Sequence, residues 1–391
     1  MFTTQFFAAY PLRIVPLLGA TVAVGLSVPA SWVGYFASLA SCGTLAGIVL
    51  APYLIRNAGV FGALRACLLA SAAGAAAFLA PHLAIVCIGA LLLGLADGPA
   101  GFAASRELHR AAPPQSRRFL FALTSMGGSF GSLTSALLVA LVVSLTDWQT
   151  AVVAVTLITA GATLPLQLLA RAWSPPSATD AVPTPSARAT RGYRDALQLI
   201  RHNRPVLRLI LGATVLSMSQ GAWLTFFVAY LVEYQNVPLQ RAAALLAATQ
   251  TLALISRLGF SKWADAIGSA RPAFVAICAL ATFAWIGLAT LDAGDHAFQL
   301  YAVIAMAGVS VAAWNGLMGA ELAMRVPDSL LVAVNGATAI TMTVAYATTV
   351  ATLAWAAGAA RGYVLPFLVV AAALALNAMN FLFLPRSSKR P

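Results

Sequence analysis

The stretch RLGFSKWADAIGSARP, from Arg257 to Pro272, concentrates charge between two long apolar runs. It holds two arginines, a lysine, an aspartate and two glycines, in a chain whose charged residues make up only 9% of the total. A short polar segment between apolar runs is typical of a loop that joins two membrane-spanning helices. The other segments of this kind therefore decide how the chain is organised.

The composition supports a membrane protein. Hydrophobic residues make up 61% of the 391 residues, and the mean hydropathy is +0.86, whereas soluble domains contain about a quarter charged residues. A soluble core of this size could not cover so much apolar surface, so we predict an all-α integral membrane protein. The net charge of +12 does not indicate a nucleic-acid partner, because the basic residues are dispersed in short loops.

The apolar runs predict twelve spanning helices, since each crossing takes about 20 apolar residues. Eleven breaks separate them, near residues 29–32, 55–62, 80–82, 105–118, 144–148, 171–205, 233–239, 263–272, 292–296, 325–329 and 356–362. The first run ends in a possible signal-peptidase site after Ala30, but its leading region carries only Arg13, and cleavage would leave an odd number of spans. We expect this first helix to be retained.

The loops differ in charge from one side of the membrane to the other. Seven arginines lie between residues 171 and 208, whereas the breaks on the opposite side hold only Arg241 and Arg361. Because Lys and Arg gather in cytoplasmic loops, we expect the N- and C-termini to be cytoplasmic.

The longest break divides the chain into six helices plus six. We predict an N-terminal six-helix bundle over residues 1–170, a cytoplasmic central loop over 171–204, and a C-terminal six-helix bundle over 205–391. The loop begins rich in Pro, Ser and Thr and ends in a basic amphipathic piece, residues 193–201, which we expect along the inner membrane face. Four identities at one constant offset indicate two pseudo-symmetric halves: Gly94, Glu107, Leu108 and Pro113 match Gly308, Glu321, Leu322 and Pro327.

The opening stretch resembles a motif of the major facilitator superfamily of secondary transporters, of the form G-x-L-A-D-R-x-G-R-R. SKWADAIGSAR places Asp265 and Gly268 on the Asp and Gly of the copy between helices 8 and 9. The copy between helices 2 and 3 falls at PYLIRNAGVFGALR, where Gly59 survives but Arg56 takes the position of the acid. The stretches VGYFASLASCGTLAG, GLADGPAGFAAS, FVAYLVE and AAWNGLMGAELA are also similar to bacterial members.

The resemblance implies the fold and location of that superfamily: two six-helix bundles that rock about a central site, in a bacterial inner membrane, as a monomer. It also implies a cytoplasmic gate, in which the Asp of the motif pairs with arginines at neighbouring helix ends. A merely solvated loop is the alternative. The candidate gate residues are Asp265, Gly268, Arg257, Arg271 and Gly59.

Asp97 in helix 4 is a candidate coupling residue. It lies about 10 Å from the predicted cytoplasmic helix end, and so within the hydrocarbon region. A carboxylate at this depth is costly unless it is protonated, paired or facing water. One interpretation is a proton-coupling or cation-binding acid, and the other is a structural hydrogen bond to a neighbouring helix.

Helix 7 carries a stripe of polar and aromatic residues at helical spacing, which suits the wall of a cavity for an organic solute as well as ordinary packing. Helices 10 and 11 add further candidates. The candidate substrate-binding residues are Gln220, Trp223, Phe227, Tyr230, Trp314, Asn315 and Tyr346. Farther along helix 10, Glu321 and Arg325 are spaced to form an ion pair. The small residues of helix 5, including Gly131, predict close helix contact.

These observations predict a secondary active transporter that moves a small neutral or cationic organic solute by alternating access, with protons as the coupling ion. Import and export stay open, although helix 5 lacks the Gly-Pro motif of many drug antiporters. A carrier-like sensor or scaffold that binds a ligand without transport is the alternative. We expect no enzyme activity, because clustered catalytic groups are limited to Glu107 and His109, and no metal or other cofactor, because the four cysteines lack ligand spacing.

Overall fold

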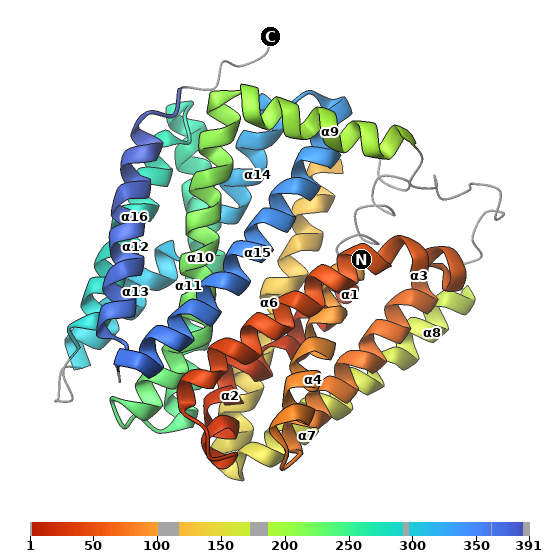
Figure 1. The fold of residues 1–391 in the computed structure, drawn as a ribbon, viewed down its shortest axis with the longest axis vertical. Coiled ribbons are helices and arrows are strands. Elements are labelled where there is room, and N and C mark those ends of the chain that lie inside the picture. Colours follow the sequence, from red (N-terminus) through yellow and green to blue (C-terminus); the bar gives the residue numbers. More distant parts are fainter. Residues whose placement is uncertain (1, 101–116, 173–186, 292–296, 361, 386–391) are drawn as a thin grey trace. The chain divides into compact units, whose positions relative to one another are not determined.

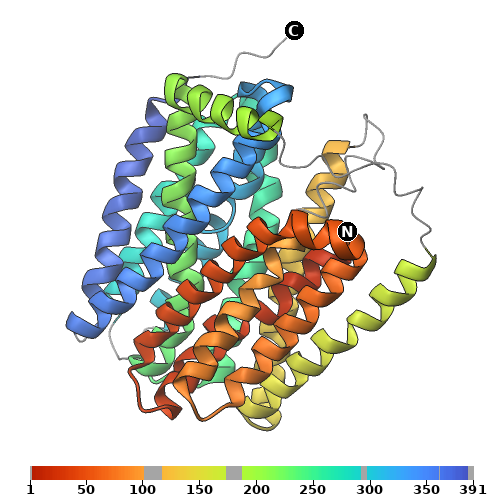
Figure 2. The same ribbon diagram turned by 45° about the vertical axis from the view of Figure 1, so that its right-hand side comes forward.

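The structure is a computed structural model that describes residues 2–100, 117–172, 187–291, 297–360 and 362–385. Within these ranges the chain forms helices and no strands (Figures 1 and 2). Twelve helical segments of the described chain are long and apolar enough to cross a membrane, which confirms the predicted number. Glu107, Leu108, His109 and Pro113 lie outside the described residues.

The described chain divides into two compact units. The first contains the described residues up to 172 together with residues 225–247, and the second contains 187–224 and 248–385. The helices up to residue 172 are α1 (Phe2–Leu12), α2 (Ile14–Gly25), α3 (Val33–Ala76), α4 (Leu83–Leu95), α6 (Arg117–Leu145), α7 (Trp148–Gly161) and α8 (Thr163–Ala172), with short 3-10 turns at Ala30–Trp32 and Ala77–Leu79.

The remaining helices follow from residue 187 on. They are α9 (Ala187–His202), α10 (Arg204–Glu233), α11 (Leu239–Ile267), α12 (Arg271–Ala289), α13 (Ala297–Ser310), α14 (Trp314–Arg325), α15 (Asp328–Ala360) and α16 (Val364–Leu382). The end of α10 and the start of α11 belong to the first unit, and the rest of both helices belongs to the second.

Several spanning segments depart from regular helix. The first span is α1 and α2 joined at Arg13, and the tenth is α13 and α14 joined by a turn over residues 311–313. The helix α3 covers two spans, with Gly59 at φ 70° and ψ 172° between them. Gly268, after the end of α11, has the same φ of 70°. The glycines of the two motif copies thus share a positive φ that other residues rarely adopt.

Backbone contact joins α3 and α4 within the first unit, where the two helices run side by side (Figure 1). A Cβ atom added at Gly94 would overlap Ala40 O, and one at Gly98 would lie 2.6 Å from Gly47 C. The hydroxyl of Thr44 donates to Gly94 O at 3.2 Å. Small residues allow this approach, because lipid offers no hydrophobic drive for helix association. The predicted close contact at Gly131 is confirmed, since a Cβ there would overlap Phe6 O.

Replacing Gly94 with Ala is expected to destabilise the first unit, because the new methyl group meets backbone that cannot move aside. Overpacking of this kind costs about 1–3 kcal/mol. The matched control is Gly161→Ala at the end of α7, where nothing lies within 4 Å of the added Cβ. Thermal unfolding of the purified proteins in detergent measures the difference. Equal melting temperatures for the two variants would contradict the described packing.

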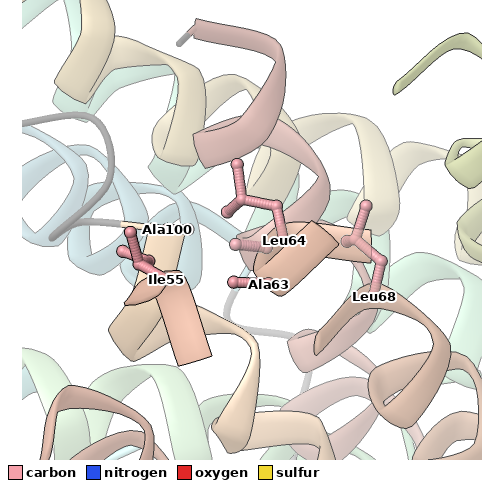
Figure 3. Packing of buried hydrophobic residues seen from close by; sticks show 6 residues of the cluster. Ile55, Ala63, Leu64, Leu68 and Ala100 are labelled. Atoms are coloured by element: carbon pink, nitrogen blue, oxygen red, sulfur yellow. The ribbon is translucent and has the colours of Figure 1, made fainter. Parts of the chain in front are cut away.

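An apolar cluster contains residues from both sides of the Gly59 break and is shown in Figure 3. It consists of Ala8, Ile55, Ala63, Leu64, Leu68 and Ala100, all buried. Ile55 and Ala63 lie on either side of the break in sequence, and Ala100 lies three residues after Asp97. Ala100, in the helical segment that carries Asp97, therefore packs with residues on both sides of the break between the second and third spans.

Asp147 begins α7 as an N-cap between two spans. Its carboxylate Oδ1 accepts from the Thr150 backbone N–H at 2.6 Å, and this hydrogen bond, with a second from the Thr150 hydroxyl, lowers the pKa of Asp147 below its ordinary value of 3.8. A lowered pKa in the folded state means that the cap stabilises α7 above pH 3.8 and that this stability is lost as the pH falls through the lowered pKa.

Hydrogen exchange is expected to reveal this cap. Protection of the Thr150 amide should fall as the pH drops below the ordinary carboxyl pKa in the unmodified protein, because the protonated cap accepts more weakly. In Asp147→Asn, whose amide oxygen also caps but does not titrate, protection should stay constant over the same range. A fall of equal size in both proteins would show that the carboxylate is not responsible.

Candidate functional site

The break in the tenth span is the centre of the candidate site in the second unit. Residues 311–313 form a turn between α13 and α14, where Ala313 N donates to Ser310 O at 3.2 Å. Carbonyl groups at such a break need donors, because lipid supplies none. Ala312 O receives two: Arg257 Nε at 2.8 Å and Asn315 Nδ2 at 3.3 Å.

Arg257 thus has a partner that the sequence does not predict. The sequence suggests that it pairs with Asp265 or reaches toward the membrane surface, but its guanidinium donates into the middle of the tenth span. Arg257 lies ten residues before the end of α11, about 15 Å along the helix axis. A half-buried cation at this depth is costly in lipid, and the carbonyl of Ala312 offsets part of that cost.

A small pocket lies beside the break, with an empty volume of about 200 Å³. Its walls come from α10, α11 and the tenth span: Gln220, Trp223, Leu224, Thr249, Gln250, Ala253, Ala307, Val311 and Ala312. None of these nine side chains is charged. Part of this volume is open to solvent.

The polar groups of the pocket are amides and a hydroxyl. Gln220 Oε1 accepts from Asn315 Nδ2 at 3.2 Å, so one asparagine amide joins the α10 wall to the carbonyl at the break. Thr249 and Gln250 of α11, which the sequence reasoning missed, also line the pocket. The sequence does contain a signal for them, because Thr249 and Gln250 are polar residues inside the otherwise largely apolar run AATQTLAL. These groups can bind neutral solutes that carry hydroxyl, amide or ring-nitrogen groups.

Trp223 is the aromatic residue that lines the pocket, and it packs against Trp285. Its ring meets Trp285 of α12 edge-to-face, with 5.4 Å between centroids and 82° between planes. Trp285 Nε1 donates to Ser219 Oγ at 2.8 Å inside the unit. Because both tryptophans are buried, the ring of Trp223 is fixed in place.

Two other predicted residues lie near this region. Tyr346 of α15 packs against Gly221, the neighbour of Gln220, where a Cβ atom would overlap its ring. Trp314 begins α14 directly after the break, and its buried indole N–H has no hydrogen-bond partner among the described residues. The predicted ion pair of Glu321 and Arg325 is confirmed, at 2.7 Å.

Asp97 belongs to the first unit and has a charged neighbour there. It lies in a helical segment over residues 97–100 that follows a turn at Ala96, and its carboxylate interacts electrostatically with Arg13. Arg13, at the junction of α1 and α2, donates from Nε to Ser132 Oγ of α6 at 2.8 Å. Sequence reasoning missed this association, which joins the first, fourth and fifth spans.

Phe227 and Tyr230 also fall in the first unit, although they continue the α10 stripe of Gln220 and Trp223. Both side chains are buried. Tyr230 stacks on Tyr234 with centroids 5.9 Å apart, and its hydroxyl accepts from Gln235 Nε2 at 3.0 Å. Of the predicted residues, Gln220 and Trp223 line one pocket, and Asn315 is hydrogen-bonded to Gln220.

Of the candidate gate residues, Asp265, Gly268 and Arg271 lie at the end of α11 and just beyond it. Asp265 is exposed, and its carbonyl accepts from Gly268 N at 3.2 Å in the turn that ends the helix. Arg271 is exposed at the start of α12. Gly59 occupies the corresponding break in α3. The described residues contain no group of three His, Cys, Asp or Glu side chains that could hold a metal ion.

The comparisons with known proteins agree with this architecture. The sequence model of the Major Facilitator Superfamily matches residues 1–350, so the chain belongs to this superfamily of membrane transporters. No curated protein matches the sequence. Among solved structures, a mutant of the nucleoside transporter NupG is similar with a TM-score of 0.75 and 15% identity over 98% of each chain.

Two further structures have the same fold. A D-xylose-proton symporter is similar with a TM-score of 0.74 and 14% identity, over 100% of this chain and 97% of that one. A POT family transporter in complex with 5-aminolevulinic acid has a TM-score of 0.73 and 14% identity, over 99% of this chain and 96% of that one. At these identities the likeness establishes the fold of a multi-pass membrane protein.

Proposed function

We propose that this protein is a secondary active transporter that moves a small neutral organic solute by alternating access. The uncharged pocket beside the break in the tenth span carries the proposal, because it combines the fixed ring of Trp223 with the amides of Gln220 and Gln250. Such a lining suits a solute with one apolar face and several polar groups. The cation of Arg257, bonded to Ala312 of the same pocket, disfavours the cationic solutes that the sequence alone also allows.

Protons are the proposed coupling ion, and Asp97 is the proposed site of protonation. Its interaction with Arg13 supports this role, because a proton on Asp97 removes the negative charge that attracts the guanidinium. Arg13 lies at the junction of α1 and α2, so a change in its interaction acts on a break in the backbone. The likeness in fold to a D-xylose-proton symporter is consistent with this proposal.

The arrangement in the membrane is part of the same proposal. We place the protein in a bacterial inner membrane as a monomer. Its termini and α9 are placed on the cytoplasmic side, because Lys and Arg tend to gather in cytoplasmic loops. The turn with Asp265, Gly268 and Arg271, together with the break at Gly59, is the proposed gate. Its two glycines at φ 70° give each half a point where the chain can bend.

Proton movement in proteoliposomes tests the transport function. The purified protein is reconstituted with a pH-sensitive dye inside, and nucleosides, pentoses, amino acids and organic cations are added outside one class at a time. Proton entry that depends on one class of neutral solute is the expected result. Binding of a solute without flux of either solute or proton would favour a carrier-like sensor. Flux driven by organic cations alone would contradict the assignment of the pocket.

A further inference from the structure

The amphipathic helix α9 lies across the other helices of the second unit. Figures 1 and 2 show it running crosswise to α10 and α15 at one end of them, and it contacts α15. Ala196 is fully buried on the side that meets the unit. Since α10 and α15 span the membrane, a helix crosswise to their ends lies parallel to the membrane surface.

The exposed side of α9 carries a stripe in which an apolar residue lies between two basic residues. Arg194, Leu197 and Arg201 follow one another at spacings of three and four residues, so they share one face. All three side chains are exposed, and Leu197 is 57% exposed. Arg204 is exposed directly after this helix, at the start of α10. Asp195, an acidic residue of α9, is also exposed and follows Arg194 in the sequence.

The charge of this region is strongly positive. Residues 187–208 contain six arginines and one aspartate. The N-terminus of the 30-residue helix α10 adds its partial positive charge beside Arg204. Asn203 caps that helix through its Oδ1, which accepts from Val206 N at 3.3 Å. An aliphatic side chain between two guanidinium groups can enter the boundary between headgroups and acyl chains while the arginines bind phosphates.

We propose that the exposed stripe of α9 is a binding surface for anionic phospholipid headgroups. Charge complementarity selects this ligand, since each Arg near an anionic membrane surface contributes about 1 kcal/mol. The guanidinium groups of Arg194 and Arg201 donate to lipid phosphates, and Leu197 packs against the upper acyl chains. This surface holds α9 to the membrane and, through its contact with α15, links lipid composition to the second unit. It does not depend on the transport function proposed above.

Hydrogen exchange of the full-length protein in nanodiscs tests this surface. One set of discs contains phosphatidylcholine alone, and the other contains phosphatidylcholine mixed with phosphatidylglycerol. The amides of α9 should exchange several-fold more slowly in the anionic discs. The double variant Arg194→Gln/Arg201→Gln should lose this difference, whereas Arg56→Gln/Arg241→Gln, which removes two exposed arginines elsewhere, should keep it. Equal exchange of the double variant and the unmodified protein in phosphatidylcholine shows that α9 is still folded.

Three outcomes would overturn the proposal. The first is identical exchange of α9 in the two kinds of disc. The second is an equal loss of the lipid effect in the control variant, which would indicate general attraction of charge rather than this stripe. The third is the same slowing when inorganic phosphate is added to phosphatidylcholine discs, which would show that a free anion is bound instead of a lipid.

Discussion

Asp97→Asn is expected to abolish solute-driven proton movement while solute binding persists. The amide has nearly the shape of the carboxyl group but cannot take up or release a proton. It also lacks the charge that attracts Arg13 in the first unit. The electrostatic attraction on the guanidinium therefore no longer changes during transport. Proteoliposomes with an internal pH dye measure the proton flux, and efflux of preloaded labelled solute without a proton gradient measures exchange.

The control is Asp147→Asn, which makes the same chemical change at an exposed site between two spans. It should leave proton flux intact. A normal proton signal in Asp97→Asn would assign Asp97 a structural role only. Loss of both proton flux and solute exchange, with a lower melting temperature, would indicate that the interaction with Arg13 holds the fold instead.

Arg257→Met is expected to weaken transport by about 10- to 100-fold, the equivalent of about 1.5–3 kcal/mol for a charged hydrogen bond. Methionine fills a similar space in the apolar helix α11 but cannot donate to Ala312 O. The carbonyl then keeps the weaker contact from Asn315 at 3.3 Å, so Asn315 is drawn from Gln220 and the pocket loses its shape. Hydrogen exchange over residues 307–316 should become faster.

A second arginine provides the matched control. Arg208 of α10 donates from Nη1 to Phe383 O at 2.6 Å, which is also a contact with a backbone carbonyl. Phe383, however, is the exposed C-cap of α16. Water can replace the donor there, so Arg208→Met should change transport less than Arg257→Met. Equal effects would show that loss of positive charge, and not the break in the tenth span, is responsible. Normal transport by Arg257→Met would contradict a positioning role.

Much of the fold could be predicted from the sequence, because lipid imposes a strong rule on composition. Each span has to be a helix of about 20 apolar residues, so the breaks between the apolar runs indicated the number of spans. Local pairs could also be predicted. Glu321 and Arg325 are four residues apart on one helix, and a side chain at that spacing has few other partners.

The backbone breaks and their partners could not be predicted in the same way. The segment VSVAAWN around residues 311–313 has no proline or glycine to signal a turn. The partner of Arg257 is a backbone carbonyl 55 residues away, and any residue type supplies such an acceptor. The stripe on α10 looked continuous because helical spacing identifies a face, but it does not identify the body against which each part of that face packs.

The break in the tenth span has a consequence for how the protein is made. The two pieces α13 and α14 contain 14 and 12 residues, which correspond to about 21 and 18 Å of helix, shorter than the roughly 30 Å of hydrocarbon. Neither piece can cross the bilayer alone during synthesis, so both must leave the insertion machinery together. Arg257 is synthesised before Ala312, so its guanidinium enters the bilayer before the carbonyl of Ala312 is present. A ribosome that stalls between the two pieces would therefore leave a cation in lipid without its partner.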